Sequence, residues 1–342
     1  MIRNSVIALT LGGIAFGATA DPVIPTILGQ SFTIDINSNT QGVVGPDDGV
    51  TGLIEKFGYA NTVATSFYYP TPCALDPVSC PNGVTFAAPG SLVRDTNINS
   101  VITAMGGPAA GTALDGSTAV SINTLTALDQ YNIDTLSPLS GIGGDDIEGF
   151  DTSWGLFYQY DIFGNVNGAG TAVNFNSGYI DLYWFKAGAL AAAEKVLSVN
   201  VTSSQTDPSN TYLFGEVDYS WCDPGDSCSA FVKSFMNSDP FNDSFYNIWK
   251  SATPPPEITF ILDTNVAPPV PTTDQLLLLT GTDPSMTLDC NPLAPGAQLC
   301  NAARQTSTSG GVEFGVPEPT SLGLMGLGMF AAGLRARRRR SH

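Results

Sequence analysis

Hydrophobic and polar residues alternate with a period of two along several stretches of the chain. The clearest stretch is VLSVNVTSS, in which Leu197, Val199 and Val201 alternate with serine, asparagine and threonine. Successive side chains of a β-strand point to opposite faces, so this pattern predicts strands with one buried and one solvated face. The same pattern occurs in SFTIDIN, GLFYQYDIFG, GYIDLYWF and EITFILD, at residues 31–37, 155–164, 178–185 and 257–263.

Clusters of glycine, proline, asparagine and aspartate separate these stretches, as in VVGPDDG, LSGIGGDD, GNVNGAG and TDPSN. Such residues favour turns, and the sequence has no repeat of fixed period, which argues against propellers and solenoids. Strands with one buried face pack as two antiparallel sheets. We therefore expect an all-β fold, an antiparallel β-sandwich (jelly-roll-like) with long loops, over residues 21–300 in one domain or two. The alanine-rich residues 187–197 fit a helix or a loop equally well.

The N-terminal segment has the pattern of a secretory signal peptide. A basic residue, Arg3, precedes an apolar run, and the small residues Ala18 and Ala20 stand at the two positions that signal peptidase reads. We expect residues 1–20 to be removed by a cut before Asp21.

Export makes disulfides the expected state of the six cysteines. The intervals CALDPVSC, CDPGDSC and CNPLAPGAQLC each contain proline with aspartate or asparagine, residues that turn the chain back on itself. We therefore expect local disulfides that staple loops, in preference to long-range bridges. Zinc is disfavoured because Cys-x-x-Cys spacing and a nearby histidine are both lacking. The expected pairs are Cys73 with Cys80, Cys222 with Cys228, and Cys290 with Cys300.

The histidine content excludes several kinds of catalytic site. The only histidine is His342, the last residue. Triads of serine, histidine and aspartate, cysteine–histidine nucleophiles and histidine-ligated zinc are therefore excluded from the body. No glycine-rich phosphate-binding motif occurs either. We expect that the protein is not an enzyme.

Carboxylates offer the remaining candidate chemistry. The segment GGDDIEGFDTSWG gathers four of them close to Trp154, and a pair of carboxylates at a sugar-binding site is what a glycosidase uses. Oxygen ligands in a loop also suit calcium, and an acidic turn that bonds its own backbone is the simplest interpretation. The four candidates are Asp145, Asp146, Glu148 and Asp151.

A second segment, DINSNTQGVVGPDDG, offers a further set of oxygen ligands for calcium. It resembles the start of an EF-hand loop only superficially, because it lacks glycine at the sixth position and glutamate at the twelfth. Calcium is thus the one cofactor that the sequence suggests, and turn-forming residues again explain the same pattern. The candidates here are Asp35, Asn37, Asn39, Asp47 and Asp48.

Two aromatic segments are candidates for contact with carbohydrate. EVDYSWC and SFYNIWK, at residues 216–222 and 244–250, place tyrosine and tryptophan beside aspartate and asparagine. Such a mixture can stack on sugar rings and bond their hydroxyl groups. Packing in a core explains the same residues more simply, and we favour the core.

The C-terminal segment has three parts in a fixed order. Pro317, Glu318 and Pro319 come first, an apolar run over residues 321–334 follows, and a basic tail at residues 335–342 ends the chain. Its arginines are Arg335, Arg337, Arg338, Arg339 and Arg340. Arginines hold the cytoplasmic side of a span, so we expect one transmembrane helix that stops transfer. The segment resembles the PEP-CTERM sorting signal of Gram-negative bacteria.

This resemblance implies a cellular destination for the protein more than a biochemical activity. Members of the family are substrates of exosortase, a membrane enzyme thought to cut near the Pro-Glu-Pro motif, and they accompany exopolysaccharide production. The resemblance therefore implies secretion machinery and exosortase as partners, transient membrane anchoring, and a final place at the cell surface, outer envelope or extracellular matrix. It covers residues 317–342 and leaves the body unassigned. Residues 301–316, NAARQTSTSGGVEFGV, are expected to be a polar spacer.

Processing makes the charge of the protein more negative. The 13 basic residues include Arg3 and the five arginines of the tail, so 7 remain against 31 acidic residues, a net charge of −24. Such a surface repels nucleic acid and attracts divalent cations. We expect a structural or adhesive protein that associates with extracellular polysaccharide in a biofilm. A carboxylate-dependent polysaccharide-active enzyme and a self-assembling surface-layer or fibre subunit, with copies of itself as partners, are the alternatives.

Overall fold

The computed structural model describes most of the chain between residues 31 and 315. The described residues are 31–36, 49–69, 86–105, 135–140, 148–150, 152–206, 210–225, 227–239, 242–251, 259–265, 270–272, 275–280 and 300–315. The strands are β1 (Phe32–Ile34), β2 (Lys56–Tyr68), β3 (Leu92–Thr96), β4 (Thr135–Ser140), β5 (Trp154–Val166), β6 (Val173–Lys186), β7 (Glu194–Thr206), β8 (Asn210–Asp218), β9 (Met236–Ser238), β10 (Asp243–Ser244), β11 (Thr259–Asn265), β12 (Leu277–Thr280) and β13 (Cys300–Gly315). The helices are α1 (Asn99–Ala104), α2 (Ala230–Ser234) and α3 (Phe245–Ser251), and a 3-10 turn spans Leu190–Ala192.

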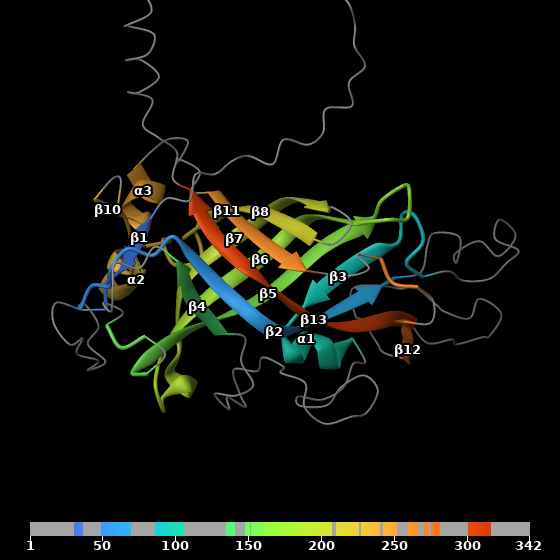
Figure 1. The fold of residues 1–342 in the computed structure, drawn as a ribbon, viewed down its shortest axis with the longest axis horizontal. Coiled ribbons are helices and arrows are strands. Elements are labelled where there is room, and N and C mark those ends of the chain that lie inside the picture. Colours follow the sequence, from blue (N-terminus) through green and yellow to red (C-terminus); the bar gives the residue numbers. More distant parts are fainter. Residues whose placement is uncertain are drawn as a thin grey trace, which may run out of the picture.

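The main sheet closes on itself. Strands β2, β3, β5, β6, β7, β8, β11 and β13 pair in that order, and β13 then pairs with β2 to complete the ring. Every pairing is antiparallel, and the order around the ring is the order in the sequence. Figure 1 shows the two layers that result, with β2, β11 and β13 in front of β5, β6 and β7. We call this ring the closed sheet.

The prediction of an antiparallel all-β fold is confirmed, and the jelly-roll topology is wrong. Two layers do face each other across one core, as in a sandwich, but both belong to one sheet. A jelly roll needs connections that cross between non-neighbouring strands. Here each strand of the ring pairs with the ring strand that follows it in the sequence, so no connection crosses between non-neighbouring strands of the ring.

The prediction of a polar spacer at residues 301–316 is wrong for the part that the structure describes. Residues Cys300–Gly315 form β13, which pairs with β2 on one side and with β11 and β12 on the other. The compact body therefore extends to Gly315, beyond the boundary expected at residue 300. The segment looks like a spacer because the inner face of β13 lines the polar part of an interior cavity.

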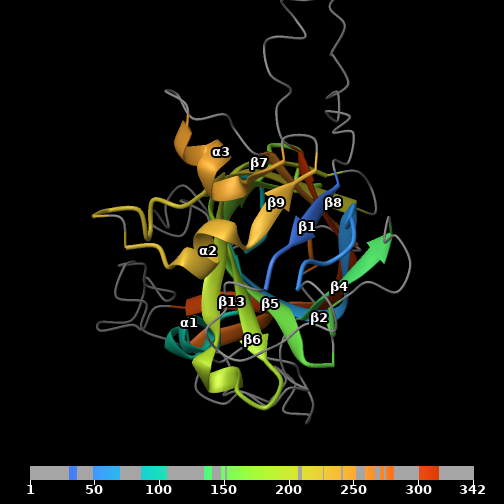
Figure 2. The same ribbon diagram turned by 90° about the vertical axis from the view of Figure 1, so that its left-hand side faces the viewer.

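One end of the closed sheet is covered by a small cap, which consists of β1, β9, β10, α2 and α3. The three strands form a sheet of their own in the order β1-β9-β10, and Figure 2 shows the cap from its outer side. Phe32 of β1 and Phe245 of α3 meet Phe314 of β13 with ring centroids 5.6 and 5.7 Å apart. Aromatic packing therefore joins the cap to the ring.

The local disulfide expected between Cys222 and Cys228 is confirmed, with Cα atoms 4.7 Å apart. It lies between β8 and α2, where the chain leaves the ring for the cap. Cys300 begins β13. Its expected partner Cys290, and the pair of Cys73 and Cys80, lie outside the described residues, as do the signal peptide and the sorting segment.

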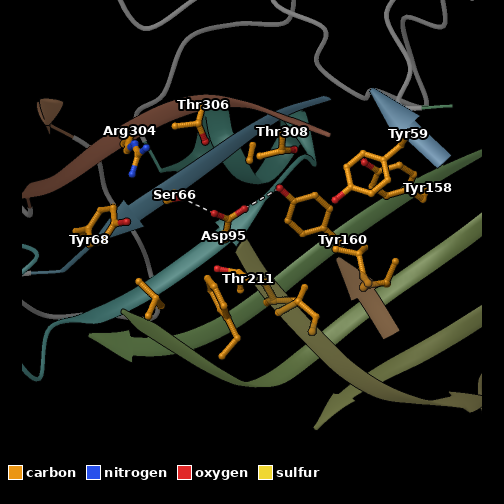
Figure 3. Close-up of a pocket in the computed structure, with 17 residues that line it drawn as sticks. Tyr59, Ser66, Tyr68, Asp95, Tyr158, Tyr160, Thr211, Arg304, Thr306 and Thr308 are labelled. Carbon is orange, nitrogen blue, oxygen red and sulfur yellow. Dashed lines mark hydrogen bonds between the residues drawn. The ribbon is translucent and has the colours of Figure 1, made fainter. Parts of the chain in front are cut away.

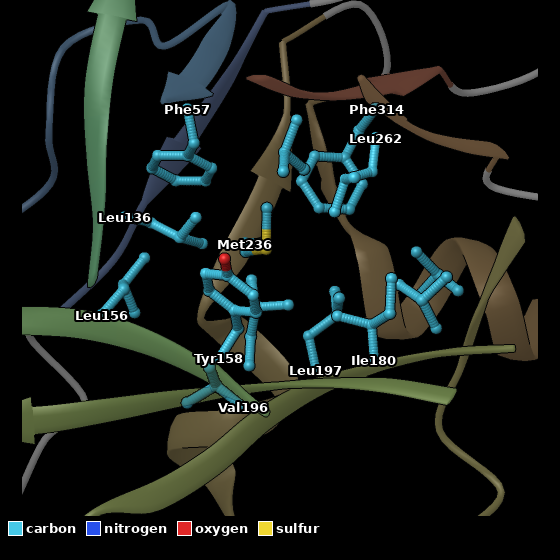
Figure 4. Packing of buried hydrophobic residues seen from close by; sticks show 14 of the residues in the cluster. Phe57, Leu136, Leu156, Tyr158, Ile180, Val196, Leu197, Met236, Leu262 and Phe314 are labelled. Atoms are coloured by element: carbon cyan, nitrogen blue, oxygen red, sulfur yellow. The ribbon is translucent and has the colours of Figure 1, made fainter. Parts of the chain in front are cut away.

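One hydrophobic core occupies the inside of the ring and continues into the cap. Figure 4 shows Phe57, Leu156, Leu197 and Phe314 pointing inward from different strands, and each of them is buried. A second, smaller group lies on the outer face, where Leu190 packs on Phe157. The alanine-rich segment therefore forms a 3-10 turn and the start of β7, not a longer helix.

A bulge changes which residues of β2 face the interior. The register of β2 with β13 shifts between Thr308 and Gly310. A shift of one residue sends alternate side chains to the other face. As a result Phe57 and Tyr59 are buried near the cap, while Ser66 and Tyr68 face the interior farther along the strand. The bulge thus gives the far end of the ring a polar wall.

Candidate functional site

The interior of the closed sheet contains a cavity at this polar wall. Its volume is about 70 Å³, counted as the space that the centre of a water molecule can occupy. Figure 3 shows its lining side chains converging from the surrounding strands. They are Tyr59, Ala64, Ser66, Tyr68, Asp95, Tyr158, Tyr160, Ile162, Val173, Phe175, Ile180, Thr211, Leu213, Leu262, Arg304, Thr306 and Thr308.

Asp95 of β3 is the centre of the polar wall. The hydroxyl of Ser66 on β2 donates a short hydrogen bond to Oδ2 of Asp95. The phenol of Tyr160 on β5 donates to Oδ1 at 2.7 Å. Burial raises the pKa of Asp95 above its ordinary value, and the two hydrogen bonds and the charge of Arg304 oppose this rise. The antiparallel pairing of β3 with both neighbours brings the three side chains together.

Arg304 of β13 supplies a positive charge to the same wall. Only 5% of this residue is exposed. Burial, and next the negative charge of Asp95, raise the pKa of the Tyr68 phenol, while Arg304 and Ser66 lower it. Thr306 and Thr308 follow on the same face of β13. The polar wall therefore contains one carboxyl group, one guanidinium and several hydroxyl groups.

The opposite wall of the cavity is apolar. It comes from β5, β6, β8 and β11 and consists of Ile162, Val173, Phe175, Ile180, Leu213 and Leu262. Thr211 is its polar exception. A space with one polar and one apolar side can orient a small molecule.

The outer face of the same strands carries a second candidate surface. Arg94 of β3 binds Asp161 of β5 through two contacts, Nε to Oδ1 at 2.8 Å and a terminal nitrogen to Oδ2 at 2.7 Å. The guanidinium also lies 5.1 Å from the ring centre of Phe163. Leu92, Phe163 and Tyr179 are exposed by 48%, 39% and 36%. We call these five residues the outer aromatic patch.

The predicted calcium ligands are only partly described. Asp35 pairs with Val50 in an isolated bridge at the cap. Glu148 is buried, and its carbonyl oxygen accepts a hydrogen bond from the Trp154 indole at 2.8 Å. The remaining candidates, Asn37, Asn39, Asp47, Asp48, Asp145, Asp146 and Asp151, lie outside the described residues. Among the residues that the structure does describe, no three acidic, histidine or cysteine side chains are grouped for a metal ion.

The two aromatic segments mostly belong to the core, as favoured above. Tyr219 and Tyr246 are buried and pack edge to face, with ring centroids 5.5 Å apart. Trp221 is the exception, because 38% of it is exposed and Lys195 lies 4.7 Å from its ring centre.

Sequence reasoning missed both Asp95 and Arg304. Asp95 stands in the short segment LVRDT, and Arg304 in a polar stretch, and neither belongs to a motif. What brings them together is the pairing of β13 with β2 and of β2 with β3. The alternation of polar residues at 304, 306 and 308, an arginine and two threonines, was the only available signal.

Comparison with known proteins identifies one segment of the chain. Residues 315–340 match the family model of the PEP-CTERM protein-sorting motif. No curated protein and no solved structure matches the chain. Among the described residues, no helix combines the length and the apolar character needed to cross a membrane, and the expected span at residues 321–334 lies outside that part. The chain therefore carries a PEP-CTERM sorting motif, which contains Pro317, Glu318 and Pro319 and implies a protein that is exported and processed by exosortase.

Proposed function

We propose that this protein is a non-enzymatic component of the cell surface or extracellular matrix, where it adheres to exopolysaccharide in a biofilm. The observation that carries the proposal is the sorting motif at residues 315–340. A protein with this motif is exported and held at the membrane until exosortase processes it. The body then works outside the cell, where disulfides persist.

The outer aromatic patch is the surface that we propose for contact with polysaccharide. Sugar rings present flat C–H faces that pack on aromatic side chains, and the patch exposes Phe163 and Tyr179 for this contact. Arg94 and Asp161 lie beside them and are already oriented by their mutual hydrogen bonds. Such paired charges can bond sugar hydroxyl groups without a further loss of side-chain freedom.

Calcium is a second element of this proposal. The mature chain carries a net charge of −24, and an acidic polysaccharide would be repelled by it. Calcium bridges carboxylates of both partners through its oxygen ligands. Adhesion to an acidic polymer is therefore expected to need the cation.

The closed sheet favours adhesion over strand-by-strand assembly. Free sheet edges are what adds strands between copies. Each of the eight strands in the ring is paired on both sides, and in the described part only short strands such as β10 and β12 end a sheet.

Binding of the purified protein to the polysaccharide of its own host tests the proposal. The wild type is expected to co-sediment with this polymer, more so with calcium than with a chelator. Phe163→Ala/Tyr179→Ala should weaken binding about tenfold, because each exposed ring contributes about 0.5–1.5 kcal/mol. Leu53→Ala removes a similarly exposed side chain, 37% accessible, outside the patch and should leave binding unchanged.

Two outcomes would contradict the proposal. The first is a protein that neither binds the polymer nor self-associates, with or without calcium. The second is release of reducing ends from the polymer that is lost in Asp145→Asn, Asp146→Asn, Glu148→Gln or Asp151→Asn, which would establish the enzyme alternative.

A further inference from the structure

We propose that the cavity inside the closed sheet is a binding site for one small, uncharged ring compound with a hydroxyl group. Phenols and cyclic alcohols are the class that we infer. The proposal does not depend on the polysaccharide-binding function, because it concerns the interior of the ring and not its outer face.

The size of the cavity sets the size of the ligand. One water molecule needs about 10–15 Å³ by the same measure, so the volume of about 70 Å³ corresponds to about five waters. A ligand of about five to ten non-hydrogen atoms therefore fits. Sheets of eight strands are in general just wide enough either to be filled by side chains or to hold one small molecule.

The charges in the wall argue for an uncharged ligand. Asp95 and Arg304, whose side chains are of opposite sign, both line the polar wall. A charged ligand would bring an additional, uncompensated charge into the interior, and burial of such a charge is costly. An uncharged ligand leaves this balance intact.

The arrangement of the walls argues for a ring with a hydroxyl group at one edge. The polar wall combines groups that donate hydrogen bonds with a carboxyl group that accepts them, and a hydroxyl can do both. The facing wall offers the ring of Phe175 with aliphatic Ile180 and Leu213. An aromatic or alicyclic ring buries its apolar area there at little entropic cost.

The cap does not occupy the part of the ring interior that contains the polar wall. The aromatic side chains that join the cap to the ring meet at Phe57 and Phe314, near the start of β2 and the end of β13. Ser66 and Arg304 stand toward the opposite ends of these strands. The polar wall is therefore not part of the packing that holds the cap.

The experiment uses the full chain in lipid nanodiscs and follows binding by fluorine NMR of 4-fluorophenol. Saturable binding is expected with a Kd of about 0.1–1 mM, typical of a ligand of this size. Cyclohexanol should displace the probe, whereas benzoate and benzylammonium should not. Leu53→Ala serves as the control and should bind as the wild type does.

Two variants inside the cavity separate binding from adventitious partitioning. Ala64→Leu fills the space and should weaken binding at least tenfold. Thr306→Val keeps the volume and removes a hydroxyl group, and should weaken 4-fluorophenol several-fold while sparing fluorobenzene. This second variant keeps the test decisive if Ala64→Leu fails to fold. Absence of saturable binding, equal binding of the charged probes, or unchanged affinity in Thr306→Val would each overturn the proposal.

Discussion

At the scale of single residues, the interior of this protein is unusual in holding a carboxyl group and a guanidinium on the inner face of a closed sheet. Asp95 accepts hydrogen bonds from Ser66 and Tyr160 and faces the charge of Arg304. These partners offset part of the cost of burial, but they do not cancel it, because the pKa of Asp95 is still raised. Asp95 is therefore expected to reduce stability when it is ionised.

Replacement of Asp95 by asparagine tests this expectation through its dependence on pH. The folded state holds the proton of Asp95 more tightly than the unfolded state, whose pKa is near 3.8. Wild-type stability therefore falls as pH rises from about 4 through the folded pKa, and Asp95→Asn escapes this loss. Urea unfolding followed by tryptophan fluorescence should show the variant gaining stability relative to wild type as the pH rises.

The exposed Asp239→Asn serves as the control for the loss of one carboxyl group. A difference between Asp95→Asn and the wild type that stays constant or shrinks with rising pH would contradict the interpretation.

Gly178 is a second residue whose identity the fold requires. Its φ is +117°, and an added Cβ would lie 2.3 Å from the carbonyl oxygen of Asp161. Gly178→Ala is therefore expected to lower the free energy of unfolding by about 2–4 kcal/mol, through backbone strain and the clash with β5. Gly168→Ala has no atom within 4 Å of the new Cβ and should change stability by less than about 0.5 kcal/mol. Similar denaturation midpoints for the two variants would refute this reasoning.

At the scale of elements, the cap is an insertion between β8 and β11 that also receives β1 from the N-terminal side. Its helices span only Ala230–Ser234 and Phe245–Ser251. Elements this short gain little stability by themselves. The cap is held by aromatic contacts and by the disulfide at its entry.

Removal of this disulfide should destabilise the protein measurably. For a sequence separation of 6 residues, loop-closure entropy predicts a loss of about 2 kcal/mol in Cys222→Ala/Cys228→Ala. Chemical denaturation of both proteins under oxidising conditions measures the difference. Intact mass should show that the remaining cysteines keep their oxidation state. A double variant as stable as the wild type would mean that the disulfide does not constrain the unfolded chain.

At the scale of the whole molecule, the closed sheet depends on its last strand. β13 pairs with β2, β11 and β12, and Glu313 binds Lys56 at 2.9 Å across 257 positions of sequence. Without β13, the edges of β2 and β11 would be exposed, and exposed edges promote aggregation.

Truncation on either side of β13 tests this dependence. A chain that ends at residue 315 should unfold cooperatively, because every strand of the ring is present. A chain that ends at residue 299 should lack a cooperative transition and should aggregate. Thermal unfolding followed by circular dichroism, with light scattering, distinguishes the two. Cooperative unfolding of the shorter chain would show that β13 is dispensable.

The strands that sequence reasoning found are those whose inner faces are apolar. Leu197 and Val199 of β7 illustrate this, because alternation of apolar and polar residues marks the strand directly. β13 was not predicted because Arg304, Thr306 and Thr308 on its inner face line the polar wall of the cavity, so no apolar residues alternate in this part of the strand. For this reason neither the cavity nor the strand that lines it could be predicted from the sequence. Closure of the ring could not be predicted either, since pairing between strands that are distant in the sequence leaves no local pattern.

The direct junction between β13 and the sorting motif has a consequence for timing. A chain exported from its N-terminus delivers β2 early and β13 last. The matched motif begins at residue 315, and β13 ends at Gly315. The ring can therefore close only after the strand next to the sorting motif has been delivered. We expect closure to coincide with arrival of the motif at the membrane, so that a cut made after closure would release a complete ring.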